Sequence, residues 1–376
     1  MVFLKRHCER PGQSLFAIGP GRVHARRARE RVVSEAIRSV RILDCLVAAL
    51  LAMTFVLMCA SAHAESIKIA TSRLIGYAGV PVAMAHGYFK EQGLEPELVF
   101  FDSAQPVAVA VASGDAQFGT AGMSASFYTL AGQGQLRLIA SAAGDGRGFY
   151  NLAFIASNKA YDAGLKTVAA IKGHSVAVTQ VGTSLQYAIG QAARRYGFTM
   201  KDVEVRALQS NSNVIAAISG GTVDAAVMPS GALLAPLAKG EFHLLSWAAD
   251  VEPNPTGSAT FASTKVANEH GDTVKRFLAA YRKGVHDFAA AFTGPDGKRQ
   301  DGPTAPDILE IMSKFTGIAP AEIAKAIPYV DPEGRIDAGS VADQIAWYKS
   351  QNLMKGDIDA SQLIDGRYAL TKVAGK

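Results

Sequence analysis

Short apolar runs alternate with longer segments of helical periodicity along residues 66–247, and this alternation constrains the fold more than any other feature. Strands that alternate with helices predict parallel, doubly wound sheets covered by helices. Beyond residue 263 the pattern is helical to the end of the chain. The strands are expected at 67–70, 98–101, 116–120, 136–141, 151–157, 176–178, 203–208, 223–227, 242–247 and 258–263.

Two segments of the chain echo each other. SGDAQFGT at 113–120 and GTVDAAV at 221–227 each end a small-residue helix with glycine, carry one Asp and enter a short strand. Two similar α/β units predict two lobes, each with ligand-accepting loops at the carboxyl ends of its strands. A ligand held between facing lobes would be enclosed.

The N-terminal segment has the pattern of an export signal. A basic region ends at Arg41, and an apolar run extends over 46–58. In Ala62-His63-Ala64 the two positions that a signal peptidase recognises, Ala62 and Ala64, are both small. We expect residues 1–64 to be a signal peptide cleaved after Ala64, which would place the mature protein in the periplasm. The alternatives are a membrane anchor, for which an apolar run of about 14 residues is short, and a lipoprotein signal at Cys59, which Met58 disfavours.

The positive net charge of +5 comes from this N-terminal segment. Residues 1–64 hold ten of the 38 Lys and Arg residues but four of the 33 acidic residues, which leaves 28 basic and 29 acidic residues after the predicted cut. A nearly neutral mature chain gives no reason to expect nucleic acid as a partner.

Cysteine and histidine usage argues against catalysis and metal binding. All three cysteines, Cys8, Cys45 and Cys59, precede the predicted cut, and the five histidines after it show no H-E-x-x-H or other metal-ligand spacing. Residues 122–126 resemble a nucleophile elbow but lack its closing glycine. We therefore predict no disulfide, no catalytic residue, no metal and no cofactor.

Three segments resemble the signature stretches of a known family. GYFKEQGL at 87–94, SGDAQFGTAG at 113–122 and GGTVDAAVMP at 220–229 look like those of periplasmic solute-binding proteins of ABC importers. The most similar group takes nitrate, sulfonates, taurine and thiamine precursors. The resemblance covers nearly the whole chain after residue 64.

The resemblance implies an architecture and a set of partners. It implies the α/β, two-lobed periplasmic-binding-protein fold of type II, with the ligand cleft between lobes joined by two crossovers. It also implies the permease and ATPase subunits of an ABC importer as partners, and we expect a monomer. Pro253 and Pro255 indicate one crossover, so we assign 65–155 plus 252–376 to lobe 1 and 156–251 to lobe 2.

Residues 175–197 contain the clearest candidate for a ligand loop. A short strand, the turn Gly182-Thr183-Ser184 and a helix follow one another, and the first-turn N–H groups of a helix attract a carboxylate, sulfonate or phosphate. The alternative is that Thr183 or Ser184 only caps the helix. The predicted place of this turn at the cleft favours the ligand site.

Further candidates come from the loops in which the family holds its ligand. Each residue alone could be an ordinary turn or cap residue, but all follow strands. The resemblance points to Ser72, Arg73, Tyr77, Gly122, Met123, Ser124, Thr183, Ser184, Asn211 and Ser230.

The segment GDGRGFY at 144–150 bears on ligand charge. Glycines free the backbone around Arg147, and Phe149 could cover an apolar ligand body. The alternative is that Arg147 pairs with Asp145 on the surface. With Arg147 in the cleft the ligand is an anion, and we expect substitution by Ala to abolish binding.

The function expected from these observations is capture of a small anionic organic molecule, a sulfonate or carboxylate, and its delivery to an ABC-type permease. A periplasmic ligand sensor is the first alternative. A thiamine-pyrimidine-precursor binding protein or enzyme on the same fold is the second; a related eukaryotic pyrimidine synthase carries clustered cysteines, which this chain lacks after residue 64.

Overall fold

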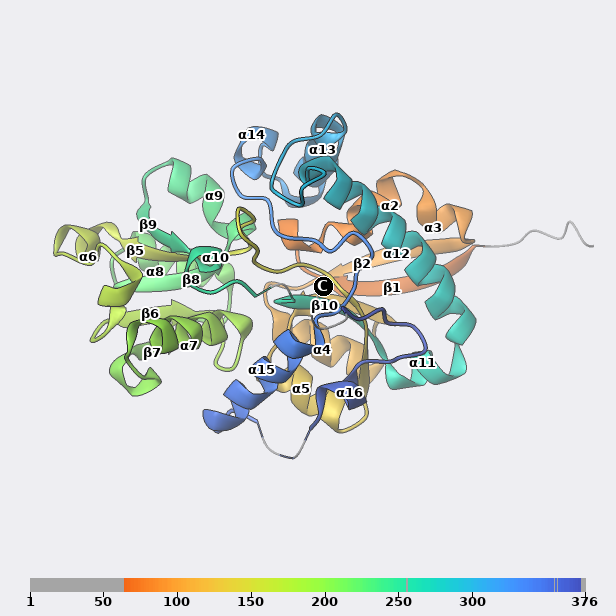
Figure 1. Cartoon of the computed structure of the whole chain (residues 1–376), viewed down its shortest axis with the longest axis horizontal. Coiled ribbons are helices and arrows are strands. Elements are labelled where there is room, and N and C mark those ends of the chain that lie inside the picture. The colour runs from red at the N-terminus through yellow and green to blue at the C-terminus, as the bar shows by residue number, and fades with distance from the viewer. Residues whose placement is uncertain (1–63, 255, 355, 357, 373–376) are drawn as a thin grey trace, which may run out of the picture. The chain divides into compact units, whose positions relative to one another are not determined.

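The computed structural model describes residues 64–254, 256–354, 356 and 358–372. The predicted export signal therefore lies outside the described residues, apart from Ala64. The described chain contains two five-stranded sheets surrounded by helices (Figure 1).

The first sheet has the strand order β2-β1-β3-β10-β4. β1 pairs in parallel with β2 and β3, whereas β10 runs antiparallel between β3 and β4. Its strands are β1 (Glu65–Thr71), β2 (Leu94–Phe100), β3 (Phe118–Gly122), β4 (Leu136–Ser141) and β10 (Ser258–Ser263).

Helices from both ends of the described chain accompany this first sheet. The N-terminal set is η1 (Ile75–Tyr77), α2 (Gly79–Ala85), α3 (Tyr88–Glu91), α4 (Ala104–Ser113) and α5 (Ala125–Gly132). The C-terminal set is α11 (Thr264–Glu269), α12 (Gly271–Phe292), α13 (Ala305–Thr316), α14 (Pro320–Ile323), α15 (Ala338–Ser350) and α16 (Ala360–Leu363).

Close helix packing in the first lobe depends on glycine. α12 crosses α2 where Gly284 faces Gly79, and a Cβ on Gly284 would lie 2.2 Å from the carbonyl oxygen of Gly79. An imidazole adds a polar contact among the same helices: His86 Nδ1 lies 2.8 Å from an oxygen of Asp287 in α12, and Nε2 lies 3.1 Å from one of Asp307 in α13.

The second sheet repeats the same topology with the order β7-β6-β8-β5-β9. Its strands are β5 (Leu152–Ser157), β6 (Ser175–Val178), β7 (Glu204–Ala207), β8 (Ala225–Pro229) and β9 (Phe242–Trp247). Its helices are α6 (Asn158–Asp162), η2 (Val168–Ile171), α7 (Ser184–Tyr196), η3 (Met200–Asp202), α8 (Asn211–Ser219), α9 (Ser230–Ala238) and α10 (Ala248–Val251).

Each sheet contains one antiparallel strand beside its parallel strands, which the alternation of strands and helices in the sequence did not predict. β5 is the first strand after the chain crosses into the second sheet, and β10 is the first after it returns. Each enters its sheet from the opposite lobe and therefore runs against its neighbours.

Two predicted element bounds also change. The lobe boundary at residue 155 cuts through β5, because Leu152–Ala156 all pair with β8 of the second sheet. The sequence also predicts one helix over 80–92, ended by Gly93; the structure has two helices there, α2 and α3, because Gly87 between them adopts φ of 76°.

The two crossovers, residues 142–151 and 252–257, are joined by backbone hydrogen bonds. The N–H of Asp145 donates to the carbonyl oxygen of Asn254 at 2.8 Å, and the N–H of Gly257 donates to that of Ala143 at 3.1 Å. The connection between the lobes is therefore a bonded pair of segments.

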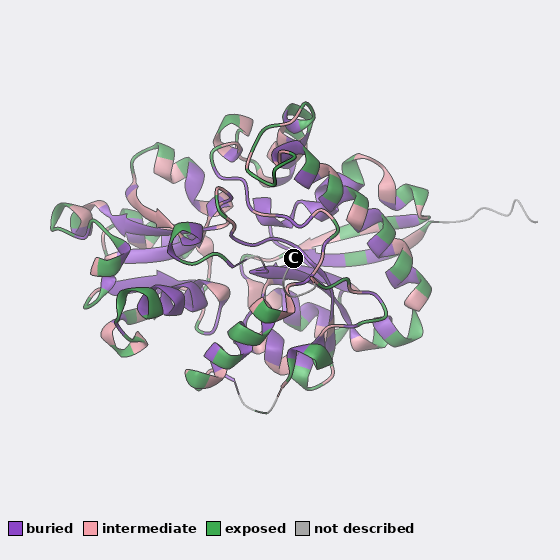
Figure 2. Cartoon of the chain, in the orientation of Figure 1, coloured by how far each residue is buried: buried purple, intermediate pink, exposed green. Residues whose placement is uncertain are grey.

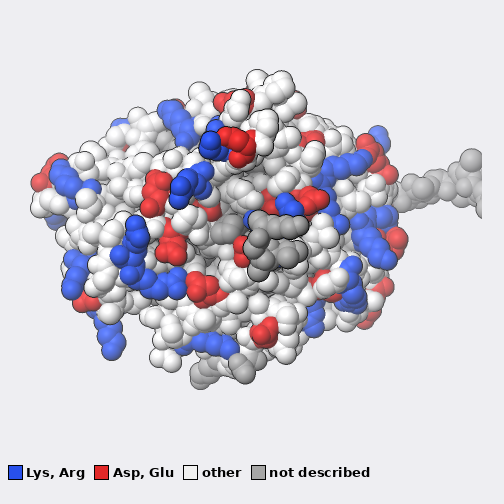
Figure 3. Space-filling model, viewed as in Figure 1, with Lys and Arg blue, Asp and Glu red and all other residues white. Residues whose placement is uncertain are grey.

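Burial and charge follow the usual division between core and surface. Figure 2 shows the buried residues concentrated on the strands of both sheets and on the helix faces that cover them. Figure 3 shows basic and acidic side chains interspersed on the visible face. No helix in the described part of the chain is long and apolar enough to cross a membrane.

Candidate functional site

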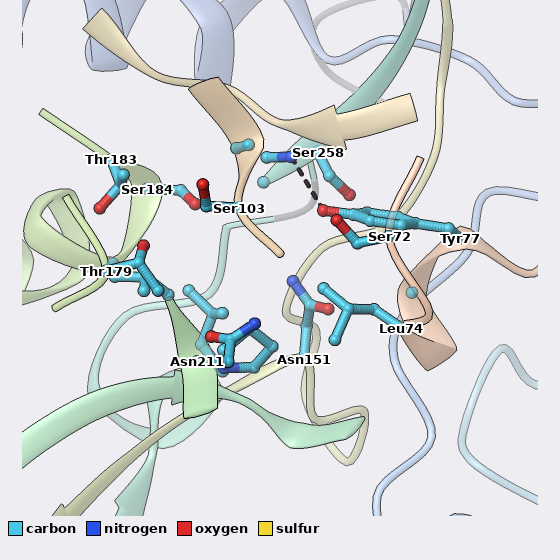
Figure 4. Close-up of a pocket in the computed structure, with 17 residues that line it drawn as sticks. Ser72, Leu74, Tyr77, Ser103, Asn151, Thr179, Thr183, Ser184, Asn211 and Ser258 are labelled. Atoms are coloured by element: carbon cyan, nitrogen blue, oxygen red, sulfur yellow. Dashed lines mark hydrogen bonds between the residues drawn. The ribbon is translucent and has the colours of Figure 1, made fainter. Parts of the chain in front are cut away.

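A small cavity of about 50 Å³ lies where the two lobes meet (Figure 4). Both lobes and both crossovers contribute to its wall. It is lined by Ser72, Leu74, Gly76, Tyr77, Ser103, Ala104, Gly122, Asn151, Leu152, Thr179, Thr183, Ser184, Leu185, Asn211, Pro229, Gly257 and Ser258.

Strand direction explains why these residues meet. Ser72 and Thr179 directly follow the parallel strands β1 and β6, at the edge where ligands bind in open α/β sheets. Leu152 and Ser258 begin the antiparallel strands β5 and β10. Because β5 and β10 run antiparallel to β1 and β6, the first residues of β5 and β10 lie at the same edge of the sheets as the last residues of β1 and β6.

Two helices, one from each lobe, start at the cavity without a side-chain cap. Ser103 precedes α4 and Thr183 precedes α7, and neither side chain accepts a hydrogen bond from its own first turn. The Thr183 hydroxyl instead donates to the carbonyl oxygen of Gln180 at 2.9 Å. By contrast, Ser124 caps α5 by accepting the N–H of Phe127 at 3.1 Å. The first turns of α4 and α7 therefore keep N–H groups for an acceptor in the cavity.

Direct contacts close the cleft around these helix starts. The N–H of Ala125 donates to the carbonyl oxygen of Gly182 at 2.7 Å, and the Gln105 amide donates to that of Val181 at 3.0 Å. Gly122 faces Ser184 so closely that a Cβ at Gly122 would lie 2.7 Å from the Ser184 Oγ. Figure 4 shows Ser103 and Ser184, from different lobes, on the same side of the cavity.

The Tyr77 phenol is a neutral group in the cavity wall. Its oxygen accepts the N–H of Gly122 at 3.0 Å, the bond drawn dashed in Figure 4. Burial raises the pKa of Tyr77 to about 12, although the Gly122 bond acts in the opposite direction. The hydroxyl therefore keeps its proton at neutral pH and can donate it to a ligand.

No charged side chain is present among the described residues that line the cavity. Its polar wall consists of hydroxyls, the amides of Asn151 and Asn211, and backbone groups. The Asn211 Nδ2 donates across the cleft to the carbonyl oxygen of Asp102 at 3.4 Å, and its Oδ1 is buried without a protein partner. Within the described residues, no group of three or more His, Cys, Asp and Glu is placed to hold a metal ion.

Six of the twelve candidates from the sequence line this cavity and six do not. Those in the wall are Ser72, Tyr77, Gly122, Thr183, Ser184 and Asn211. The two arginines are among the others. Arg73 donates to the carbonyl oxygen of Phe315 at 3.0 Å and lies 3.7 Å over the Phe100 ring. Arg147 is exposed and outside the wall.

The remaining four candidates have structural contacts. Phe149 is buried against Tyr329, with ring centroids 5.8 Å apart. Met123 is buried, and its sulfur lies 3.4 Å from the Tyr128 hydroxyl oxygen. Ser124 caps α5, and the backbone N–H of Ser230 donates to the carbonyl oxygen of Asn151 at 2.8 Å.

Several wall residues were missed from the sequence. Ser103 and Thr179 could have been found, because they stand between a strand and a helix as Thr183 does. Asn151 directly precedes β5 and Ser258 begins β10, so identifying them requires the strand direction, which the sequence pattern does not carry.

Comparisons with solved structures show the same fold. The aliphatic sulphonate binding protein SsuA of Escherichia coli is 21% identical, with a TM-score of 0.62 over 83% of this chain and 94% of that one. The alkanesulfonate-binding protein SsuA of Xanthomonas axonopodis pv. citri, solved bound to MOPS, is 17% identical, with a TM-score of 0.65 over 80% and 98%. The nitrate-binding protein NrtA of Synechocystis PCC 6803 is 12% identical, with a TM-score of 0.61 over 79% and 84%.

These three solved structures are substrate-binding proteins and not enzymes. None of the curated protein sequences matches the chain significantly. The profile of the NMT1/THI5 like family matches residues 75–292, which is more than half of the chain. With this match, and with the two-lobed fold of the solved periplasmic binding proteins, the chain belongs to the NMT1/THI5-like family.

Proposed function

We propose that this chain is an exported solute-binding protein that captures a small anionic organic molecule between its lobes and delivers it to an ABC-type permease. The observation that carries the proposal is the meeting of two uncapped helix starts, α4 and α7, at the same cavity. In this proposal residues 1–64 are the export signal, and the protein acts in the periplasm as a monomer without a cofactor.

Electrostatics favour an anion over a cation. The N-terminus of each helix carries a partial positive charge and unpaired N–H groups. The Ser103 and Ser184 hydroxyls at these helix starts add rotatable donors, while the described wall holds no carboxylate that would attract a cation. A sulfonate or carboxylate group placed between α4 and α7 would accept donors from both lobes.

The rest of the wall favours a short organic body. Leu74, Leu152, Leu185 and Pro229 supply apolar surface beside the polar end. Burial of apolar carbon is favourable by roughly 25 cal/mol per Å², so these side chains would favour an alkyl group over a bare inorganic anion. The cavity volume of about 50 Å³ limits that group to a few carbons unless the lobes move apart.

Calorimetry and thermal melting with defined probes test the ligand class. We would use ethanesulfonate, propanoate, MOPS and nitrate, with ethylammonium as a cationic control. A probe at a hundred times its Kd stabilises the folded state by about 2.7 kcal/mol and raises the Tm. We expect ethanesulfonate or propanoate to raise it and ethylammonium to leave it unchanged. A shift with ethylammonium alone, or with none of the four anions, would contradict the proposal.

A pair of serine variants tests the site. Ser184→Ala removes a hydroxyl at the α7 start, whereas Ser219→Ala removes an exposed hydroxyl at the far end of α8 in the same lobe. Loss of a hydrogen bond to an anion should weaken binding roughly ten-fold in the first variant, with affinity unchanged in the second. Equal affinities in both variants would remove Ser184 from the site.

Export is tested separately by N-terminal sequencing of the protein released from the periplasm. The proposal expects Glu65 as the first residue. Retention of the whole chain in the cytoplasm would reject export without affecting the ligand measurements.

A further inference from the structure

Helix α15 contacts both lobes and one crossover, although it follows the last strand of the first lobe by many residues. Two hydrogen bonds anchor it to the first lobe. The Tyr348 hydroxyl donates to the carbonyl oxygen of Met123 at 3.0 Å, and the Tyr128 hydroxyl of α5 donates to the Gln344 Oε1 at 3.2 Å. All three side chains, Tyr348, Tyr128 and Gln344, are fully buried.

The same helix is bonded to the second crossover. The Gln344 Nε2 donates to the carbonyl oxygen of Thr256 at 2.8 Å, and the N–H of Asp337, the residue before the helix, donates to the Thr256 hydroxyl at 3.1 Å. Gln344 therefore uses both ends of its amide, one on the first lobe and one on the crossover.

The adjacent face of α15, about 100° around the helix from Gln344 and Tyr348, packs on α7 of the second lobe. Asp343 accepts the Tyr187 hydroxyl at 2.6 Å and an Arg194 guanidinium nitrogen at 3.0 Å. The Trp347 indole lies flat enough on Gly190 that a Cβ there would be 2.2 Å from the indole Nε1. Polar and apolar contacts thus hold one side of α7 over about two turns.

α7 carries this contact to the ligand cavity. Its first residue, Ser184, lines the cavity, and Gly190 and Arg194 lie on the same unbroken helix. A helix moves as a stiff rod over this length, so a tilt imposed at Gly190 displaces the first turn as well. If α15 fixes the position of α7, it therefore also fixes the position of the part of the cavity wall that α7 supplies.

We propose that α15 sets the closed arrangement of the two lobes, with Asp343 and Trp347 as positioning residues for the start of α7. The inference goes beyond the proposed function, because it concerns how the lobes are held and not which molecule they bind. Its test needs no ligand, so failure of the ligand assignment would leave it standing.

A distance between two spin labels measures the arrangement. The chain after residue 64 contains no cysteine, so Lys90→Cys on α3 and Ala163→Cys after α6 give one label on each lobe at exposed positions. In this background Gly190→Ala drives a methyl group into the Trp347 indole. We expect a second, longer-distance population in the ligand-free protein. A distribution that superimposes on that of the parent would overturn the proposal.

A second substitution separates the contact from a distorted helix. Alanine is the better helix former, so Gly190→Ala by itself should not disrupt α7. Adding Trp347→Leu removes the indole that the new methyl meets. Because Trp347 is itself a positioning residue, the double variant should lose most but not all of the longer-distance population; an undiminished longer-distance population would show that the contact with α15 is not its cause.

Two neighbouring arginines provide a matched test of the polar contact. Arg194 pairs with Asp343, whereas Arg195 makes no ion pair within the described residues. Arg194→Gln and Asp343→Ala should each increase the longer-distance population, and Arg195→Gln should not. Equal effects of the two arginine substitutions would contradict the role of Asp343, and thermal melts would confirm that each variant is folded.

Discussion

Asp145 offers the sharpest prediction about stability, because it is a carboxyl group buried in the connection between the lobes. It is 2% exposed, and its Oδ1 accepts the N–H groups of Asn151 at 2.9 Å and Leu152 at 3.1 Å. Burial raises the pKa of Asp145 from 3.8 to about 7, and the negative charge of Asp250 adds to the rise, while the two N–H bonds oppose it.

The sign of the pH dependence follows from this raised pKa. Between the unfolded value of 3.8 and the folded value of about 7, the folded protein binds more protons at Asp145 than the unfolded chain does. Stability from this group is therefore fully present below pH 4 and is lost as the pH rises through 7. The difference between the two pKa values corresponds to about 4 kcal/mol.

Asp145→Asn tests this reasoning, because the amide oxygen can still accept both N–H bonds while the group no longer ionises. We expect the variant to match the parent near pH 4 and to exceed its unfolding free energy by up to about 4 kcal/mol above pH 8. Urea unfolding of both proteins from pH 4 to pH 9 measures the difference and cancels the contribution of other titrating groups. Parallel stability curves, with no pH-dependent gap, would refute the assignment.

Three further predictions concern packing, the discarded arginine candidate and a histidine. Gly284→Ala should destabilise the fold by about 2 kcal/mol through overpacking, seen as a lower Tm, while Gly366→Ala, with open space around it, should leave the Tm unchanged. Because Arg147 is exposed and outside the cavity wall, Arg147→Ala should retain affinity for ethanesulfonate; ten-fold weaker binding by calorimetry would return it to the site. Burial alone would lower the pKa of His86, but hydrogen bonds to its two carboxylate partners outweigh burial and raise it, so its stabilising effect is present below pH 6.5 and lost at higher pH. His86→Gln should therefore lower the Tm more at pH 5.5 than at pH 8.5, and an equal loss at both would contradict this.

Much of the fold could be predicted from local pattern. The strands 136–141, 242–247 and 258–263 have the bounds expected from their apolar runs and flanking turn residues. The direction of β5 and β10 could not be predicted, since a short apolar run has the same pattern whether the strand runs parallel or antiparallel to its neighbours. The sequence pattern likewise did not indicate that β5 belongs to the second sheet, because a short apolar run does not identify the strands that it pairs with.

The candidate site shows a similar division. Thr183 and Ser184 were predicted because strand, turn and helix leave one place for a helix start. Arg147 lies outside the cavity wall, which the sequence could not indicate because glycines on both sides permit many backbone paths and do not determine where a long side chain points. Asn151 could not be predicted, because its place in the wall depends on the path of the first crossover, in which its N–H donates to Asp145 Oδ1 at 2.9 Å.

The hydrogen bonds between the crossovers have a mechanical consequence. Since residue 145 is tied to 254 and residue 143 to 257, neither segment can twist without the other. We therefore expect the pair to move as one short ribbon, so that the two lobes rotate relative to each other mainly about a single axis. Opening is then described by one angle, so a single well-chosen interlobe distance can follow the whole motion.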